Sequence, residues 1–344
     1  DIRNKSMTTI LKELPLLCLQ DSSLKDVLRD LAFVPTSNGD LQFPKNLYDP
    51  RIEEFKSLLD EEESFPSEEF RSAEILDALQ TLGLQTVVSP ETVLRSARQV
   101  EMLQEQIPDE ANVRGFLLLT YLESNAAKLF PTTIGDGINM FLKVSDFFQN
   151  QRSDTNISKK FWNELSSICW CPVLVKSPHP GLPWPLVTTS VAPPRLVRLP
   201  SDLWLASASM RILNGDCHST FLSQKLGWTE PLGGNIIAAQ LLELGKNTMN
   251  AESKGLKQAL ATIIPKMYTI LTEKIGTEDL DVVKTILEGC QWVWVGDRFV
   301  TVQDVVLDGP LHLAPYLWVI PADVAVFKEL LVELGVKESL TIQD

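Results

Sequence analysis

Residues 31–43 contain Leu31-Ala32-Phe33-Val34-Pro35, then Asn38-Gly39-Asp40, then Leu41-Gln42-Phe43. Two short runs of β-prone residues around an Asn-Gly pair predict a β-hairpin with a tight turn. The chain continues through Leu47-Tyr48-Asp49-Pro50 into residues 55–59, whose apolar side chains have helical spacing. This order of hairpin, aromatic residue, proline and helix decides the fold because it recurs along the chain.

The same order returns near the C-terminus. Trp292-Val293-Trp294-Val295 opens a second hairpin around a Gly-Asp turn, and Leu317-Trp318-Val319-Ile320-Pro321 precedes a helical segment at 327–331. We therefore equate Trp318 with Tyr48, and Pro321 with Pro50, as the aromatic residue and the proline that begins the helix. A unit repeated in this way is typical of stacked supersecondary modules whose interfaces form the core.

A more degenerate copy lies between these two. Its first strand is expected within 168–174, and Trp204 in Leu-Trp-Leu is its aromatic element. Each copy ends in a helix closed by leucine and glycine, at Gly83, Gly227 and Gly335. Glycine just past a helix accepts the left-handed backbone that ends it, so these three positions are predicted helix stops.

The expected fold class is α+β and predominantly helical, with small β-hairpins in about three related hairpin-plus-helix modules that form an elongated body. Apolar residues at three- and four-residue spacing predict the connecting helices. These helices cover residues 110–128, 158–168, 253–275 and 278–288. Pro265 should kink or divide the third of them, because proline removes a helical hydrogen bond. Ser89-Pro90-Glu91 supplies a cap and an N1 proline for another helix.

These signals divide the chain into three segments. Residues 1–107 hold the first module, with a hairpin near 31–43 and a Leu-Gly stop at 82–83. Residues 108–250 hold a helical segment and the second, degenerate module. Residues 251–344 hold a helical hairpin and the third module.

Two connections are expected to be exposed. One is the acidic run 60–63, and the other is a proline-rich loop at 177–201. Within that loop, Pro183 and Pro185 keep the backbone around Trp184 extended, which makes this ring hard to bury in a helix. Trp184 is therefore a candidate partner contact or a plug on an adjacent module. The other tryptophans are expected in the core.

The composition argues against some classes of binding partner. The 344 residues are 44% hydrophobic and 22% charged, as in an ordinary folded protein. Forty-five acidic against 31 basic side chains give a net charge of −14, which repels phosphate backbones and anionic lipid. We expect no nucleic acid and no membrane partner, and no apolar run approaches the roughly 20 residues of a membrane span.

Five scattered cysteines suit free thiols in a reducing compartment, so we expect a cytoplasmic location. Cys169, Cys171 and the pair Cys217-His218 lack the spacing of a zinc knuckle, and no metal is expected. The chain begins with Asp1 and shows no targeting peptide, so we interpret it as a segment of a longer protein.

Catalytic and nucleotide signals are weak. Gly135-Asp136-Gly137 has the form of an Asp-x-Gly nucleotide element, but no further glycine-rich lid follows, and a simple turn before a helix is the preferred interpretation. Gly233-Gly234-Asn235 before a helix offers an anion site, against the alternative of a flexible cap. His179, His218 and His312 lie near no nucleophile signature. We therefore expect no enzyme activity and no cofactor.

Several motifs together resemble the repeating region of the sacsin family and its plant members. The matching elements span nearly the whole chain: Phe33-Val34-Pro35, Leu47-Tyr48-Asp49-Pro50, Phe65-Pro66-Ser67-Glu68-Glu69-Phe70, Leu82-Gly83-Leu84, Leu203-Trp204-Leu205-Ala206-Ser207 and Pro315-Tyr316-Leu317 through Gly335-Val336. In that family each large repeat begins with a GHKL-type ATP-binding fold. This chain lacks the family's Asp-x-Gly-x-Gly and its Glu and Asn for water and magnesium, so the resemblance implies a segment downstream of that fold.

The resemblance implies a role in protein quality control. We expect a non-catalytic repeat segment of a giant chaperone or co-chaperone that acts as a scaffold and protein docking surface. Its expected partners are proteins: other repeats of the same chain, clients or cytoskeletal proteins. The alternative is a purely architectural spacer or oligomerisation element that relays motion from a neighbouring ATPase domain.

Overall fold

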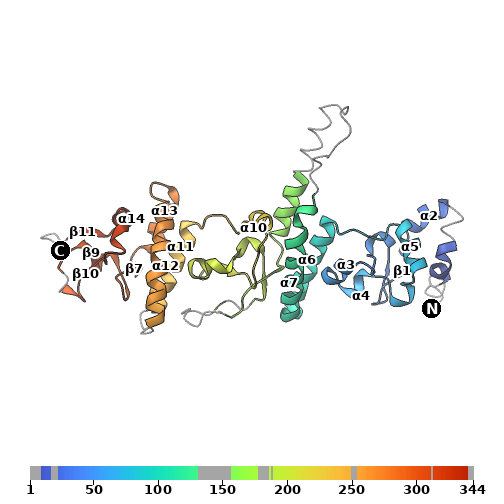
Figure 1. The fold of residues 1–344 in the computed structure, drawn as a ribbon, viewed down its shortest axis with the longest axis horizontal. Helices are drawn as coiled ribbons and strands as arrows, with labels where there is room; N and C mark the ends of the chain where they lie inside the picture. Colours follow the sequence, from blue (N-terminus) through green and yellow to red (C-terminus); the bar gives the residue numbers. More distant parts are fainter. Residues whose placement is uncertain are drawn as a thin grey trace, which may run out of the picture. The chain divides into compact units, whose positions relative to one another are not determined.

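The computed structural model describes residues 9–16, 22–130, 156–176, 186, 189–248, 254–310 and 313–339 (Figure 1). The chain divides into two compact units. The first comprises Asp1–Pro172 with His218–Leu226, and the second comprises Val173–Cys217 with Gly227–Asp344. The expected α+β, predominantly helical class is confirmed, since the strands form only small sheets beside many helices. The division into three sequence segments stays a prediction.

The first unit consists mainly of short helices and strands that lie before residue 130. Besides helical residues 9–16 and 156–165, its elements are α2 (Ser22–Arg29), β1 (Val34–Pro35), β2 (Leu41–Gln42), η1 (Pro44–Asn46), α3 (Glu53–Leu58), α4 (Glu61–Ser64), η2 (Glu68–Phe70), α5 (Ala73–Thr81), α6 (Pro90–Gln106), α7 (Pro108–Asn125), η3 (Ala126–Lys128), β3 (Cys171–Pro172) and α10 (Thr220–Lys225).

The second unit combines three long helices with short strands. Its elements are β4 (Val191–Ala192), η4 (Pro194–Leu196), β5 (Val197–Arg198), η5 (Pro200–Asp202), α9 (Leu203–Ala206), β6 (Arg211–Ile212), α11 (Gly234–Thr248), α12 (Lys254–Thr272), α13 (Glu278–Leu287), β7 (Val293–Trp294), β8 (Phe299–Val300), η6 (Val302–Asp304), β9 (Val305–Asp308), β10 (Trp318–Val319), η8 (Ala325–Phe327), α14 (Lys328–Glu333) and β11 (Lys337–Ser339). Figure 1 shows α11, α12 and α13 side by side.

Both predicted hairpins form. β1 pairs antiparallel with β2, with Val34 opposite Gln42, and β7 pairs antiparallel with β8, with Val293 opposite Val300. The turn before β8 contains Gly296, whose φ is 99°. The Asn-Gly and Gly-Asp signals thus identified both hairpins from sequence.

A parallel bridge follows each of these hairpins. Tyr48 pairs with Gln85 in the first unit, and Val306 pairs in the same way with Lys337, which joins β9 to β11. In the middle copy, β5 pairs parallel with β6, which corresponds to the pairing of β9 with β10. Each bridge joins the strand after the hairpin to a segment much later in the chain.

The expected equivalence of Trp318 with Tyr48 is wrong. Tyr48 occupies the position of Val306 in β9, whereas Trp318 lies in β10, on the other side of β9. The counterpart of Trp318 is Ser64, whose carbonyl accepts a hydrogen bond from the Tyr48 amide at 3.0 Å. Pro321 therefore does not match Pro50. Sequence order misled here because aromatic residues fill different strands of the two copies.

The middle copy differs from its prediction in the position of its aromatic residue, Trp204. The first strand lies within 168–174 as expected, at β3, but Trp204 belongs to helix α9 and not to a strand. Leu213, after β6, bridges antiparallel to Val173, just as Pro66 bridges to Thr36 in the first copy. β6, and not the Trp204 segment, is thus the equivalent strand.

All three predicted stop glycines have a left-handed backbone, with φ of 111° at Gly83, 76° at Gly227 and 99° at Gly335. In the first copy the Leu84 amide bonds back to the Leu79 carbonyl at 3.0 Å. In the third, the Val336 amide bonds to the Leu331 carbonyl at 2.9 Å. These are Schellman bonds, and each places the apolar residue after glycine against the end of the helix.

Each unit has its own hydrophobic core. In the first, Leu11, Leu14, Phe33 and Phe70 join the buried face of α5. In the second, the core residues come from α11, α12, α13 and the strands β7 to β9. Five tryptophans are at least 96% buried, and their exposed fractions are 4% for Trp162, 0% for Trp170, 2% for Trp228 and 1% for Trp292 and Trp294.

The long helices lie where periodicity predicted them, with one difference. α12 continues through Pro265 and is not divided there, because the surrounding core buries its apolar face. Ser89 caps α6 in a capping box with Thr92. No described helix has both the length and the apolarity needed to cross a bilayer.

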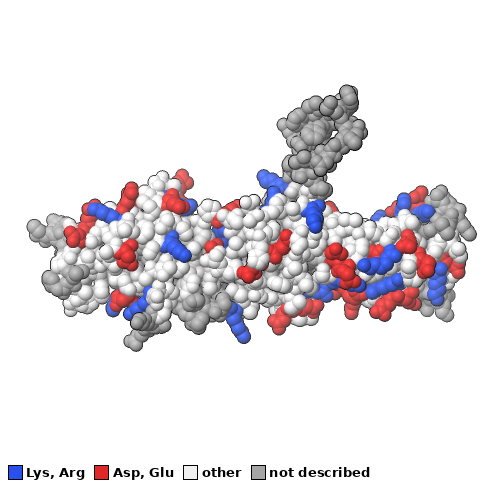
Figure 2. Space-filling model, in the orientation of Figure 1, with Lys and Arg blue, Asp and Glu red and all other residues white. Residues whose placement is uncertain are grey.

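The two expected exposed connections contain local structure. Asp60 caps the short helix α4 by accepting from the amides of Glu62 and Glu63, and Ser64 at its end is fully buried. Most of 177–188 lies outside the described residues, but the rest of the proline-rich segment forms β4, η4 and β5. Figure 2 shows acidic side chains gathered over the region of α3 and α4.

The left-handed glycine after α14 yields the first prediction. Gly335→Ala should lower the free energy of unfolding by roughly 1–2 kcal/mol, because a Cβ disfavours this backbone region even where space is free. Denaturant unfolding of the chain measures the change. Gly335→Asn should lose less, and Gly255→Ala, at an exposed position in α12, should not destabilise. Equal losses in all three variants would contradict the assigned role of Gly335.

Candidate functional site

The conspicuous aromatic residues of the repeats pack inside their own units. Tyr48 is 7% exposed, lies 4.9 Å from the Phe55 ring between centroids, and carries the Arg95 guanidinium over its face at 5.5 Å. Trp318 is partly buried beneath the Arg298 guanidinium at 4.8 Å. Trp204 packs against the core of the second unit. These rings contribute apolar burial and cation–π contacts to the fold.

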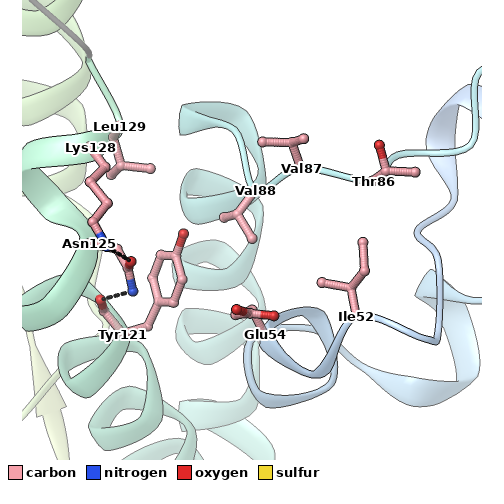
Figure 3. Close-up of a pocket in the computed structure, with 9 residues that line it drawn as sticks. All are labelled: Ile52, Glu54, Thr86, Val87, Val88, Tyr121, Asn125, Lys128 and Leu129. Atoms are coloured by element: carbon pink, nitrogen blue, oxygen red, sulfur yellow. Dashed lines mark hydrogen bonds between the residues drawn. The ribbon is translucent and has the colours of Figure 1, made fainter.

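A pocket opens in the first unit between α3, residues 86–88 and the end of α7. It has a volume of about 280 Å³, and Figure 3 shows its lining: Ile52, Glu54, Thr86, Val87, Val88, Tyr121, Asn125, Lys128 and Leu129. The Glu54 carboxylate from α3 and the Tyr121 ring from α7 both line this pocket. Burial, and secondarily the negative charge of Glu54, raise the pKa of the Tyr121 hydroxyl.

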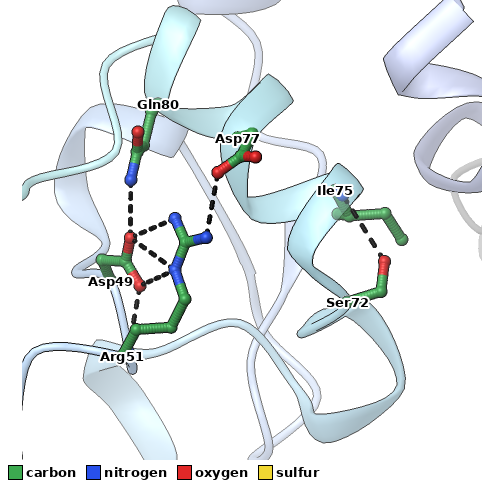
Figure 4. A network of polar contacts seen from close by, with 6 residues as sticks. All are labelled: Asp49, Arg51, Ser72, Ile75, Asp77 and Gln80. Carbon is green, nitrogen blue, oxygen red and sulfur yellow. Dashed lines mark hydrogen bonds and ion pairs between the residues drawn. The ribbon is translucent and has the colours of Figure 1, made fainter.

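A second polar cluster surrounds Asp49, whose side chain is only 2% exposed (Figure 4). Arg51 donates to both carboxylate oxygens through Nε and Nη2, with Nη2 at 2.8 Å from Oδ2. Gln80 on α5 donates to the same Oδ2 at 2.7 Å, and Arg51 Nη1 reaches Asp77 at 2.9 Å. The cluster ties the chain after Tyr48 to α5, so its polar groups are all occupied by structure.

The pKa of Asp49 reflects these contacts. Burial by itself would raise the pKa of this carboxyl group, but the hydrogen bonds from Arg51 and Gln80 outweigh burial and hold it below its usual range. A low pKa means that Asp49 is charged at neutral pH and that the fold stabilises the charged form. This is the behaviour of a structural ion pair rather than of a proton-transfer group.

In the middle copy, the buried Arg198 side chain joins two segments of the chain, as the Asp49 cluster does in the first copy. Its residue is 6% exposed, and its guanidinium donates to the carbonyls of Gly227 at 3.3 Å, Trp228 at 3.0 Å and Glu230 at 2.9 Å. The Trp228 indole in turn donates to the Pro194 carbonyl at 3.0 Å. Arg198 therefore fixes the segment after the Gly227 stop.

The candidate anion site at Gly233-Gly234-Asn235 is already filled by the protein. The Gly234 amide, at the start of α11, donates to Asp279 Oδ2 at 3.1 Å. A side chain at Gly234 would meet Val283 at 2.7 Å, so this glycine permits close packing of α11 on α13. The helix terminus thus has a carboxylate from its neighbour as its cap.

Several candidate residues lie outside the described part of the chain. They are the partner-contact group Pro183, Trp184 and Pro185, the Gly135-Asp136-Gly137 element, His179 and His312. Among the residues that the structure does describe, no three His, Cys, Asp or Glu side chains converge in a metal-binding group. The absence of metals and cofactors stays a prediction.

The sequence alone does not identify the residues that form the polar clusters. Arg51 and Gln80 are ordinary surface types, and nothing in a single sequence indicates that both reach Asp49. The pocket combines residues from 52 to 129, so only the fold brings Glu54 and Tyr121 together. Arg198 sits in a proline-rich stretch that we expected to be extended and exposed.

The Asp49 cluster yields a stability prediction. Arg51→Gln should lower the free energy of unfolding by about 1–3 kcal/mol, because it leaves a buried carboxylate without its main donor. Lys56→Gln is the matched control, since it removes the cation of an exposed pair with Glu53 at 2.8 Å and should cost under about 1 kcal/mol. Denaturant unfolding of both variants tests this, and equal small losses would contradict it.

The low pKa of Asp49 yields a pH prediction. The stability that this carboxylate contributes is present above its unfolded pKa of about 3.9 and is lost as pH falls through the lower folded value. Asp49→Asn should therefore be less stable than the parent at pH 7 but lose less stability between about pH 5 and pH 3. Acid unfolding curves measure the difference, and parallel acid limbs would refute it.

Sequence comparison shows that the chain is similar to human sacsin (Homo sapiens). The two are 24% identical over 355 residues, an alignment that covers 97% of this chain and 7% of sacsin. No family model matches the chain, and no solved structure matches it. The alignment therefore spans nearly all of this chain and a small part of a much larger protein. This similarity supports a sacsin-related segment.

Proposed function

We propose that the chain is a non-catalytic repeat segment of a large, sacsin-like chaperone or co-chaperone, and that it works as a scaffold and docking surface for proteins. The observation that carries the proposal is the repeated module of hairpin, parallel bridge and glycine-stopped helix. Its distinctive residues are used in packing, which leaves the surface as the working part. Similarity to sacsin over nearly the whole chain supports the same view.

The buried polar groups favour a non-catalytic role. The buried Asp49 carboxylate and the buried Arg198 guanidinium have structural partners, and the partly exposed Asp279 carboxylate caps α11. A catalytic base or nucleophile needs access to a substrate and a pKa matched to proton transfer. Asp49 has neither, since it is buried and its pKa is lowered.

Exposed apolar side chains on α7 favour docking over a purely architectural spacer. Val113 is 60% exposed, Phe116 47% and Leu117 38%. These residues are three and four positions apart, so they share one face of the helix. Met102 and Ile107, at 59% and 49%, add further apolar surface nearby in the sequence. Contiguous apolar surface on a folded protein is typical of an interaction site.

The proposed partners follow from this surface and from the charge. They are unfolded or partly folded client proteins, cytoskeletal proteins and other repeats of the full-length chain, in the cytoplasm. A net charge of −14 disfavours nucleic acid and anionic membrane. The segment works without cofactor or metal of its own.

Aggregation of reduced insulin, followed by light scattering, tests the docking role. The chain should slow aggregation in proportion to its concentration, and Phe116→Ser should weaken the effect because it removes the largest exposed ring of α7. Tyr316→Ser is the matched control, since Tyr316 is 89% exposed outside α7. No suppression of insulin or of several other clients, together with self-association in solution, would favour the architectural spacer instead.

A further inference from the structure

The helix α7 carries apolar side chains on two opposite faces. One face is buried in the first unit, where α6 and α3 pack against α7, and its residues are Ala111, Gly115, Leu118, Leu119 and Leu122. The other face is exposed and follows the same three- and four-residue spacing, and its residues are Asp109, Val113, Phe116, Leu117, Thr120 and Ser124. A helix with apolar residues all round is typical of one that is covered on both sides.

Side-chain size changes along the exposed face. Its first half holds the bulky Val113, Phe116 and Leu117, and its second half holds the smaller Thr120 and Ser124. The Thr120 hydroxyl donates to the Phe116 carbonyl of its own helix at 2.9 Å, so covering Thr120 leaves no donor unsatisfied. Two copies of this face laid antiparallel place the bulky half of each over the small half of the other, which lets the side chains interdigitate.

The two ends of the face carry opposite charges. Asp109 is exposed in the first turn of α7, and the described residues give its carboxylate no salt-bridge or hydrogen-bond partner. Lys128, in η3 just after α7, is exposed and donates to the neutral Asn125 side chain at 3.3 Å, which leaves its charge uncancelled. Lys128 also lines the pocket of Figure 3, but its flexible stem can turn the ammonium group toward either side of the helix.

We infer that the exposed face of α7 binds the same face of a second copy of this chain, with the two helices antiparallel. One register joins opposite charges at the ends and large with small residues between them. Its facing pairs are Asp109 with Lys128 of the second copy, Val113 with Ser124 of the second copy, and Leu117 with Thr120 of the second copy. The interface is isologous, so each pair occurs twice. This inference rests on the proposed docking function and names one docked partner.

The size of the face predicts a weak dimer. The 18 residues of α7 span about 27 Å, and one face of a helix is about 10 Å wide. Two such faces cover roughly 500–600 Å² in total, whereas stable protein interfaces bury roughly 1,200–2,000 Å². The dimer should therefore have a Kd of roughly 10–500 µM. At lower protein concentration the face is free, so pairing and the docking of a client compete for the same surface.

Sedimentation equilibrium of the 344-residue chain, from about 5 µM to about 1 mM, tests the pairing. The chain should pass from monomer to dimer in this range. Asp109→Lys should raise the dimer Kd by roughly fivefold to thirtyfold, because two symmetry-related charge pairs change from attraction to repulsion. Lys128→Glu should do the same for the same reason. The chain with both substitutions should regain the parent Kd, since every facing pair again has opposite charges.

Mixing the two single variants tests the orientation of the helices. An equimolar mixture of Asp109→Lys and Lys128→Glu should dimerise more tightly than either variant alone, because only the mixed antiparallel pair faces opposite charges at both ends. These differences should shrink at high salt, since exposed charges are screened. Thr120→Arg should abolish the dimer, because a long charged side chain at a small position holds the helices apart.

Glu74→Lys is the matched control for charge reversal. Glu74 is an exposed acid in the first turn of α5, as Asp109 is in α7, but it lies outside the exposed face. Its reversal should change the dimer Kd by less than about twofold.

Three results would overturn the inference. They are a monomer at every concentration, a dimer whose Kd none of the Asp109, Lys128 and Thr120 variants changes, and a mixture that dimerises no better than the single variants. If the chain still suppresses insulin aggregation in any of these cases, α7 binds clients and only the pairing is wrong. A dimer that behaves as expected without suppression of any client would keep the pairing and remove the client-docking role.

Discussion

The structure depends on the parallel bridge that joins the strand after each outer hairpin to the second residue after the stop glycine. A two-residue strand has too few ladder bonds to persist alone, and an isolated hairpin of this size is marginal in water. The Tyr48–Gln85 bridge and the pairing of Val306 with Lys337 remove this weakness by anchoring each hairpin to the end of a helix. The helix must therefore stop at a fixed point, which explains the left-handed glycine there.

Polar side chains, like these bridges, hold separate segments of the chain together. Arg51 neutralises the buried Asp49 carboxylate, and Gln80 donates a hydrogen bond to it. Arg198 donates to the carbonyls of Gly227, Trp228 and Glu230, and Asp279 caps α11. The bonds from Gln80, Arg198 and Gly234 each join segments that are distant in sequence. Because these groups are occupied by the fold, the proposed docking role rests on exposed surface such as the apolar face of α7.

Much of the fold was predictable because its signals are local. Asn-Gly and Gly-Asp turns, the Ser89 cap and the Leu-Gly stops depend on a few adjacent residues, and they identified both outer hairpins and the helix ends. Equating Trp318 with Tyr48 failed because strand order is decided by long-range pairing. The pocket was not predictable, since Glu54 and Tyr121 are brought together only by the packing of α3 on α7.

Native-state hydrogen exchange of the first module tests this account most directly. The amides of Asp49 and Gln85, which form the bridge, and the Schellman amide of Leu84 should lose protection together in one cooperative opening as denaturant is added. That result would show that bridge and helix end stabilise each other. The account is contradicted if the bridge amides exchange at unprotected rates while Leu84 and the amides of α5 stay protected.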